Sequence, residues 1–239
     1  MTTNGTLVDA EQNHRWLLDE FVRLLLLQEP SSVLDVGCGA GRLLKSCRAA
    51  GVATRGIDRA GPRLDALREE GHDVLEGTAY ELPVDDRSVD WVTLRHVPHH
   101  LEDPPRAFAE ALRVAQTGVI IAEPCYDSTL PTQQAAIAVD AWEKRQHRRG
   151  GMYHAEVMDL AALLGALPGS ADREFEIEVV RNLRLRDRSV SAFERDAQEL
   201  LADVPGDHPE RAALAKLMAL LERTGLTFNG SQCVVLRRR

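Results

Sequence analysis

Between residues 32 and 122, short continuous apolar runs alternate with stretches in which apolar residues recur every three or four positions. The continuous runs predict buried strands at residues 32–36, 53–57, 73–75, 90–94 and 118–122. The stretches between them predict one-sided helices at residues 42–50, 63–70 and 104–114. Strands and helices that alternate in this way predict an α/β fold, in which helices cover both faces of a mostly parallel sheet.

The segments on either side of this region have a more helical pattern. An amphipathic helix is predicted at residues 10–28, since proline at position 30 disfavours helix in the residue before it. The pattern after residue 124 predicts helices at residues 133–149, 155–167, 190–202 and 209–223, and strands at residues 174–186 and 226–236. Because the connections are short, we expect one domain with helical additions.

Composition and charge narrow the classes of function. The chain has 239 residues, of which 44% are hydrophobic, and its formal net charge of −8 is a poor match to a protein that follows a nucleic-acid backbone. No run approaches the roughly 20 apolar residues of a membrane helix, and residues 1–20 lack the pattern of a signal peptide. The 4 cysteines have no C-x-x-C spacing, which favours reduced thiols. We therefore expect a cytoplasmic protein without nucleic-acid or membrane partners.

A glycine-rich turn follows the first predicted strand. Glycines at positions 37, 39 and 41 precede a helix start, and glycine permits both a tight turn and the close approach of a ligand to the backbone. Asp58 ends the second strand about 20 residues later, where a carboxylate can accept two hydrogen bonds from a ribose diol. The turn and Asp58 together predict a nucleoside-type ligand.

The spacing Gly-x-Gly-x-Gly differs from the dinucleotide fingerprint Gly-x-Gly-x-x-Gly, and Asp35 lies two residues before the first glycine. An acid at this turn suits a cofactor that carries an ammonium group and no pyrophosphate. On these residues the sequence resembles the class I S-adenosylmethionine-dependent methyltransferases, in particular their small-molecule (type 11) branch. The resemblance extends over residues 31–124 and includes the loop at residues 97–104.

The resemblance implies a Rossmann-like, mostly parallel sheet of seven strands within a single domain over residues 1–239. Residues 1–30 would form an N-terminal helix or lid, and residues 31–125 the cofactor-binding core. Helical additions at residues 126–170 and 187–225 would line the substrate pocket.

The resemblance also implies which residues bind S-adenosylmethionine. Asp35 and the backbone carbonyl of Arg95 would hold the methionine amine. The backbones of Gly37 and Gly39 would line the methionine part of the cofactor.

The nucleoside part would be held by the neighbouring strands. Asp58 would bind the ribose hydroxyls, and Arg59 would flank the adenine. Thr78 and Ala79, after the third strand, lie where the family places its adenine contacts.

Methyl transfer is an in-line displacement, so the protein chiefly aligns the nucleophile and removes its proton. His96, His99 and His100 follow the fourth strand, and an imidazole titrates near neutral pH. Glu123 ends the fifth strand, at the edge where parallel sheets bind ligands. We predict His99 as the general base with Glu123 assisting, and His96 as the reserve. The alternative is that these histidines cap or pack, and we expect no metal at this triplet.

We therefore predict an S-adenosylmethionine-dependent methyltransferase that acts on a small-molecule metabolite at oxygen or nitrogen. Three alternatives stay open: a nucleic-acid or protein methyltransferase, a binding protein or non-methylating enzyme such as a cyclase that retains the cofactor, and an NAD-dependent oxidoreductase. A homodimer is compatible with the sequence, which does not specify the oligomeric state.

Overall fold

The computed structural model describes residues 9–239. The chain divides into two compact units, each built from separate segments of the sequence. Unit 1 comprises the described residues before Leu17 together with Pro124–Glu156 and Asn182–Ser231. Unit 2 comprises Leu17–Glu123, Val157–Arg181 and Gln232–Arg239. The single domain expected from the sequence stays a prediction.

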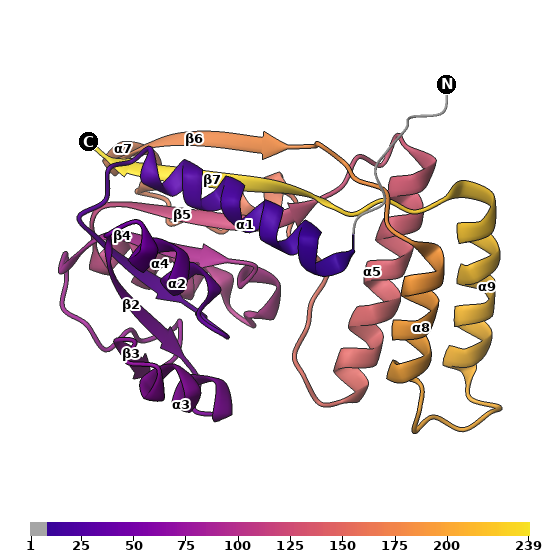
Figure 1. Ribbon diagram of the computed structural model, residues 1–239. Helices are drawn as coiled ribbons and strands as arrows, with labels where there is room; N and C mark the ends of the chain where they lie inside the picture. Colours follow the sequence, from indigo (N-terminus) through magenta and orange to yellow (C-terminus); the bar gives the residue numbers. More distant parts are fainter. Residues whose placement is uncertain (1–8) are drawn as a thin grey trace. The chain divides into compact units, whose positions relative to one another are not determined.

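Seven strands of the described chain form one sheet, in the order β3-β2-β1-β4-β5-β7-β6, and apart from a few terminal residues they belong to unit 2 (Figure 1). The strands are β1 (Ser32–Val36), β2 (Ala53–Asp58), β3 (Val74–Glu76), β4 (Val89–Arg95), β5 (Ala115–Cys125), β6 (Phe175–Asn182) and β7 (Gly230–Arg238). β1 pairs in parallel with both β2 and β4, β2 with β3, and β4 with β5. The predicted α/β fold with a mostly parallel, seven-stranded sheet is confirmed.

Successive residues of each central strand face opposite sides of the sheet, and a separate core forms on each side. On one side, Val33 and Trp91 pack in a cluster with Phe21 of helix α1 (Ala10–Leu26) and with α2 (Arg42–Ala49). On the other side, Leu34 and Val92 pack in a cluster with residues of α4 (Pro104–Val114). Burial on both faces explains why these strands read as continuous apolar runs in the sequence.

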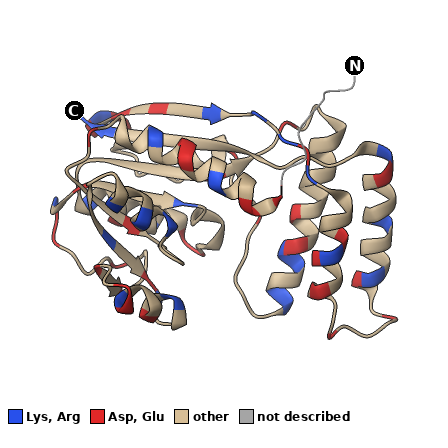
Figure 2. Cartoon of the chain, viewed as in Figure 1, with Lys and Arg blue, Asp and Glu red and all other residues tan. Residues whose placement is uncertain are grey.

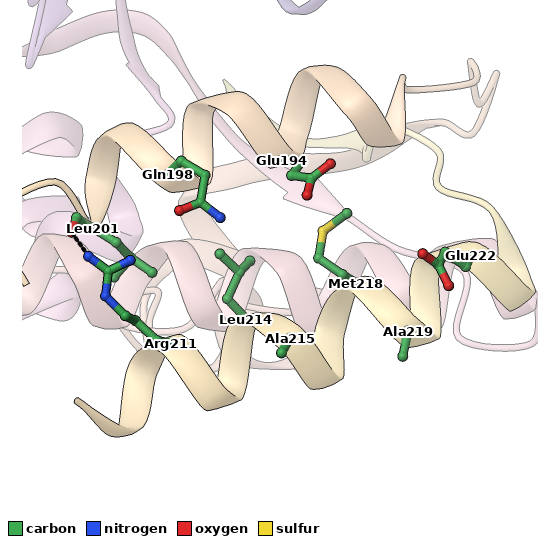
Figure 3. Close-up of a pocket in the computed structure, with 9 residues that line it drawn as sticks. All are labelled: Glu194, Gln198, Leu201, Arg211, Leu214, Ala215, Met218, Ala219 and Glu222. Atoms are coloured by element: carbon green, nitrogen blue, oxygen red, sulfur yellow. Dashed lines mark hydrogen bonds between the residues drawn. The ribbon is translucent and has the colours of Figure 1, made fainter. Parts of the chain in front are cut away.

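The remaining helices are α3 (Pro62–Glu69), the short 3₁₀ helix η1 (Pro98–His100), α5 (Pro131–Arg149), α6 (Leu160–Gly165), α7 (Ala171–Glu174), α8 (Val190–Leu200) and α9 (Pro209–Thr224). In unit 1, α5, α8 and α9 share a core in which the Trp142 ring meets the Phe193 ring edge-on, with centroids 6.1 Å apart. A hollow of about 360 Å³ opens between α8 and α9, and the labelled side chains Leu214 and Met218 line it (Figure 3).

Three element boundaries in the C-terminal half differ from the prediction by four residues or more. The helix predicted at residues 155–167 begins only at Leu160, because the Asp159 side chain accepts a hydrogen bond from the Ala162 amide at 2.8 Å and so caps the helix there. The strand predicted at residues 174–186 ends at Asn182, whose side chain accepts from the Arg184 amide at 3.0 Å in a local turn. The final strand begins at Gly230 instead of residue 226. None of the described helices combines the length and the apolar character that crossing a membrane requires.

Candidate functional site

The candidate site begins at the turn between β1 and α2. Gly37, Gly39 and Gly41 have φ angles of 73°, 55° and 68°, in the left-handed region that favours glycine. The Gly37 and Cys38 amides both donate to the Ile57 carbonyl, at 2.7 and 3.1 Å, which ties the turn to the end of β2. A Cβ atom on Gly37 would lie 2.5 Å from Cγ2 of Val97. The tight turn therefore requires glycine at position 37.

Asp58 lies beside this turn because β2 is the parallel neighbour of β1. Its Oδ2 accepts from the Gly39 amide at 2.6 Å, and its Oδ1 accepts from the Arg59 amide at 2.7 Å. A carboxylate offers about four acceptor positions, and the two backbone amides use one on each oxygen. The half-buried carboxylate is thus fixed in position and retains capacity to accept further hydrogen bonds.

A cavity of about 350 Å³ adjoins Asp58. Gly39, Asp58, Arg59, Ala60, Gly61, Pro62, Arg63 and Leu64 line it. Thr78 and Ala79 are not among the lining residues, although the Gly77 amide donates to the Asp58 carbonyl at 2.9 Å and brings their loop to the same edge of the sheet. The Thr78 side chain is exposed there, and Ala79 is half-buried.

Asp35 is a buried carboxyl group, with 4% exposure, on the strand that leads into the turn. The Thr93 hydroxyl of β4 donates to its Oδ1 at 3.0 Å. Burial raises the pKa of Asp35 to about 7, although the hydrogen bond from Thr93 and the charge of Arg95 both lower it. A cationic ligand group beside Asp35 would favour the ionised form.

The other end of the candidate site contains a histidine–carboxylate pair. His99 Nδ1 lies 2.8 Å from Oε1 and 2.9 Å from Oε2 of Glu123, and both side chains are buried. When Nδ1 carries a proton it donates to the carboxylate, an arrangement that orients an imidazole and stabilises its charged form. The structure therefore brings together the two residues that the sequence pairs as base and assistant.

His96 and His100 lie next to this pair. The ring centroids of His96 and His100 are 6.5 and 4.4 Å from that of His99. His96 has a φ of 56°, and its amide donates to the Ala122 carbonyl at 2.8 Å. A left-handed backbone at a residue other than glycine is strained, and such strain tends to concentrate at functional sites.

Two residues near the site were not identified from the sequence. Thr93 is the one polar residue within the stretch at residues 91–94 of β4, and that polar residue was the available signal. Phe21 looks like any other core residue of an amphipathic helix, yet its ring lies 5.8 Å from the Arg95 guanidinium carbon. No pattern within α1 indicates this contact.

The groups at the turn fit a nucleoside with a cationic tail. Asp58 offers fixed acceptors for a sugar diol, the glycine backbone permits close approach, and Asp35 offers a carboxyl group that a cation would ionise.

Comparisons with known proteins agree with this geometry. A model of the methyltransferase domain family matches residues 34–122. An uncharacterized methyltransferase of Mycobacterium tuberculosis (strain ATCC 25618 / H37Rv) is 37% identical over 101 residues, which cover 41% of this chain and 41% of that protein. The chain thus aligns with about two fifths of the length of this curated relative.

Two solved structures share the fold. The YcgJ protein of Bacillus subtilis has a TM-score of 0.62 at 15% identity, with 95% of this chain and 99% of that chain covered. The cyclase SpnF has a TM-score of 0.59 at 22% identity, with 99% of this chain and 84% of that chain covered. Residues 34–122 thus match the methyltransferase domain family, and the chain has the fold of class I S-adenosylmethionine-dependent methyltransferases.

Proposed function

We propose that this protein transfers a methyl group from S-adenosylmethionine to an oxygen or nitrogen atom of a small-molecule metabolite. The observation that carries the proposal is the fixed position of the Asp58 carboxylate on the amides of Gly39 and Arg59, directly beside the glycine turn. Bound at this place, the cofactor supplies an electrophilic methyl group on a sulfonium centre.

The nucleoside of the cofactor would lie along the edge formed by β1, β2 and β3. Asp58 would accept hydrogen bonds from the two ribose hydroxyls, because both of its oxygens are already oriented by backbone amides. Arg59 would flank the adenine, and the loop of Thr78 and Ala79 would contact its edge.

The methionine part would lie over the glycine turn and the end of β4. The backbones of Gly37 and Gly39 would line it at close range. Asp35 would hold the ammonium group, and the carbonyl of Arg95 would add a second acceptor. The ammonium charge offsets the cost of ionising a buried carboxyl group, so each group favours the charged form of the other.

His99 would remove the proton from the acceptor during transfer. With Nδ1 bound to Glu123, the imidazole presents its opposite nitrogen, Nε2, as the base. Glu123 would stabilise the imidazolium that forms, and His96 is the reserve base in the same cluster. Asp–His pairs in hydrolases work by the same division of roles.

The charge distribution supports a small acceptor. The formal net charge is −8, and Lys and Arg are interspersed with Asp and Glu along α5, α8 and α9 (Figure 2). A nucleic-acid substrate is better served by a basic stripe that follows the phosphates. The proposal includes a cytoplasmic location, with which the 4 free, buried cysteines agree. It also includes assembly as a homodimer.

A second candidate function is a cyclase that retains the cofactor without transferring its methyl group. The likeness in fold to the cyclase SpnF, over 99% of this chain, supports this candidate, because a chain of this fold can be a cyclase as well as a methyltransferase. Only methyl transfer releases S-adenosylhomocysteine, so product analysis separates the two candidates.

The test is turnover of methyl-labelled S-adenosylmethionine with a panel of hydroxyl- and amine-bearing metabolites. We expect label in an acceptor and an equal amount of S-adenosylhomocysteine. His99→Ala should lower turnover by roughly 10²- to 10⁴-fold, since a positioned base contributes about that much. His72→Ala is the matched control, because its ring pairs with Glu70 at the end of α3 and neither residue belongs to the proposed site. Full activity in His99→Ala contradicts the assigned base, and conversion of a substrate without release of S-adenosylhomocysteine contradicts methyl transfer.

A further prediction concerns the sugar contact. Asp58→Ala should weaken S-adenosylhomocysteine binding by about 1–3 kcal/mol in calorimetry, the range for removing a charged hydrogen-bond partner. Asp65→Ala removes an acid of the adjacent helix that pairs with Arg68 at the surface, and it should leave the affinity unchanged. Equal affinities for all three proteins contradict the assignment of Asp58.

A further inference from the structure

Arg95 lies on the same side of the sheet as Asp35. Side chains alternate along β4, so Trp91, Thr93 and Arg95 share one face, and the neighbouring β1 places Val33 and Asp35 on that face as well. The hydrogen bond between Thr93 and Asp35 agrees with this alternation, as does the Arg95 guanidinium over the Phe21 ring. A carboxyl group and a guanidinium are therefore held on one face, at the end of the site where the methionine part would lie.

The guanidinium of Arg95 lacks a carboxylate partner. Within residues 9–239 it makes no ion pair and no hydrogen bond, and its central carbon lies over the Phe21 ring, 5.8 Å from the ring centroid. Burial lowers the pKa of Arg95, while the Asp35 charge raises it. A guanidinium carries five donors, and a half-buried one that lacks acceptors costs free energy unless a ligand supplies them.

We propose that the Arg95 side chain binds the α-carboxylate of the cofactor's methionine, while Asp35 binds the α-ammonium. The inference rests on the proposed function, and it adds a side-chain role to a residue assigned only through its backbone carbonyl. Asp35 binds the Thr93 hydroxyl and Arg95 lies over the Phe21 ring, and within residues 9–239 no ion pair joins the two side chains. Both side chains therefore remain available to an amino-acid group, which carries an ammonium and a carboxylate on one carbon. The planar guanidinium is suited to a two-point contact with that carboxylate.

Arg42, the first residue of α2, is the competing cation. It is close enough to affect Arg95 electrostatically, but its side chain is exposed. An exposed charge is screened by solvent and contributes less to ligand binding than one that is partly buried. Arg42 is thus a matched control for the charge alone.

The test compares S-adenosylmethionine with its decarboxylated form, which keeps the nucleoside, the sulfonium and the amine. Calorimetry on the wild-type chain should show a preference for the intact cofactor of roughly 10- to 100-fold, as expected for charge-assisted hydrogen bonds. Arg95→Gln should bind both compounds with similar affinity. Arg42→Gln should keep most of the wild-type preference.

Melting of the ligand-free proteins separates binding from folding. A charge that serves a ligand can be removed without loss of stability, so Arg95→Gln and the apolar, unbranched Arg95→Met should melt at or above the wild-type temperature. If Arg95→Gln does not fold, Arg95→Met provides the same comparison of ligands. An unchanged preference in the Arg95 variants, or its loss in Arg42→Gln alone, overturns the inference while the proposed function stands. Failure of the wild-type chain to bind S-adenosylmethionine contradicts both.

Discussion

Asp35 shows how a single residue can be unfavourable for folding and useful for binding. The carboxyl group lies in the interior of a strand, and its raised pKa of about 7 means that the folded protein resists its ionisation. A partner that brings a positive charge reverses this penalty. A cation bound beside Asp35 therefore affects the free energy of unfolding, and measurements at several pH values can show the sign of the effect of Asp35.

We predict that Asp35→Asn stabilises the ligand-free protein at alkaline pH. The folded-state pKa of about 7 lies above the ordinary value of 3.8, so stability is lost as pH rises between these values. The amide cannot ionise, and it still offers an oxygen to the Thr93 hydroxyl. The gain in the free energy of unfolding of Asp35→Asn over wild type should be absent at pH 4 and reach at most about 4 kcal/mol at pH 8.

Urea unfolding at several pH values measures this difference. Asp65→Asn, at an exposed position of α3, should show no such dependence. The same Asp35→Asn variant should bind S-adenosylhomocysteine more weakly than wild type. A stability difference that does not grow with pH contradicts the buried carboxyl group, and unchanged affinity contradicts its role toward the ammonium.

At the scale of elements, the turn between β1 and α2 connects the fold to the site. Its glycines were visible in the sequence, and so was the alternation of strands and helices that places it at the carboxyl edge of a parallel sheet. That alternation also brings Asp58 beside the turn and His99 beside Glu123, because neighbouring parallel strands end at one edge. These juxtapositions follow from topology, which is why the sequence could predict them.

Other features depend on side-chain contacts that no local pattern encodes. The position of Phe21 over Arg95 is set by how α1 packs on the sheet. The helix start at Leu160 depends on whether Asp159 caps or lies inside the helix, and its apolar periodicity fits both. The left-handed backbone of His96 likewise arises from its surroundings and not from its residue type.

The turn itself yields a prediction. Gly37→Ala should destabilise the protein more than Gly51→Ala, although both glycines have left-handed backbones, with φ of 73° and 79°. A Cβ at position 51 meets no atom within 4 Å, so that variant bears only the backbone cost of about 1–2 kcal/mol. At position 37 the clash with Val97 adds about 1–3 kcal/mol.

Chemical denaturation of the two variants provides the comparison. Gly37→Ala should also reduce cofactor affinity, since the displaced turn carries the Gly39 amide that positions Asp58. Equal destabilisation by both substitutions contradicts the requirement for glycine at position 37.

At the scale of the whole molecule, the chain comprises a sheet unit that carries every proposed cofactor contact and a unit dominated by α5, α8 and α9. The matching methyltransferase domain, residues 34–122, lies within the sheet unit. The sequence resembles the family over this region, whereas the helical unit has no comparable motif. The acceptor is accordingly the part of the function that the sequence leaves open.

The central claim is that the glycine turn and Asp58 hold an adenosyl cofactor. A crystal structure of the protein with S-adenosylhomocysteine measures this most directly. We predict both ribose hydroxyls at about 2.6–3.0 Å from the Asp58 carboxylate oxygens, with the homocysteine amine at Asp35. An adenosyl group bound elsewhere, or a turn filled by protein side chains, would contradict the account.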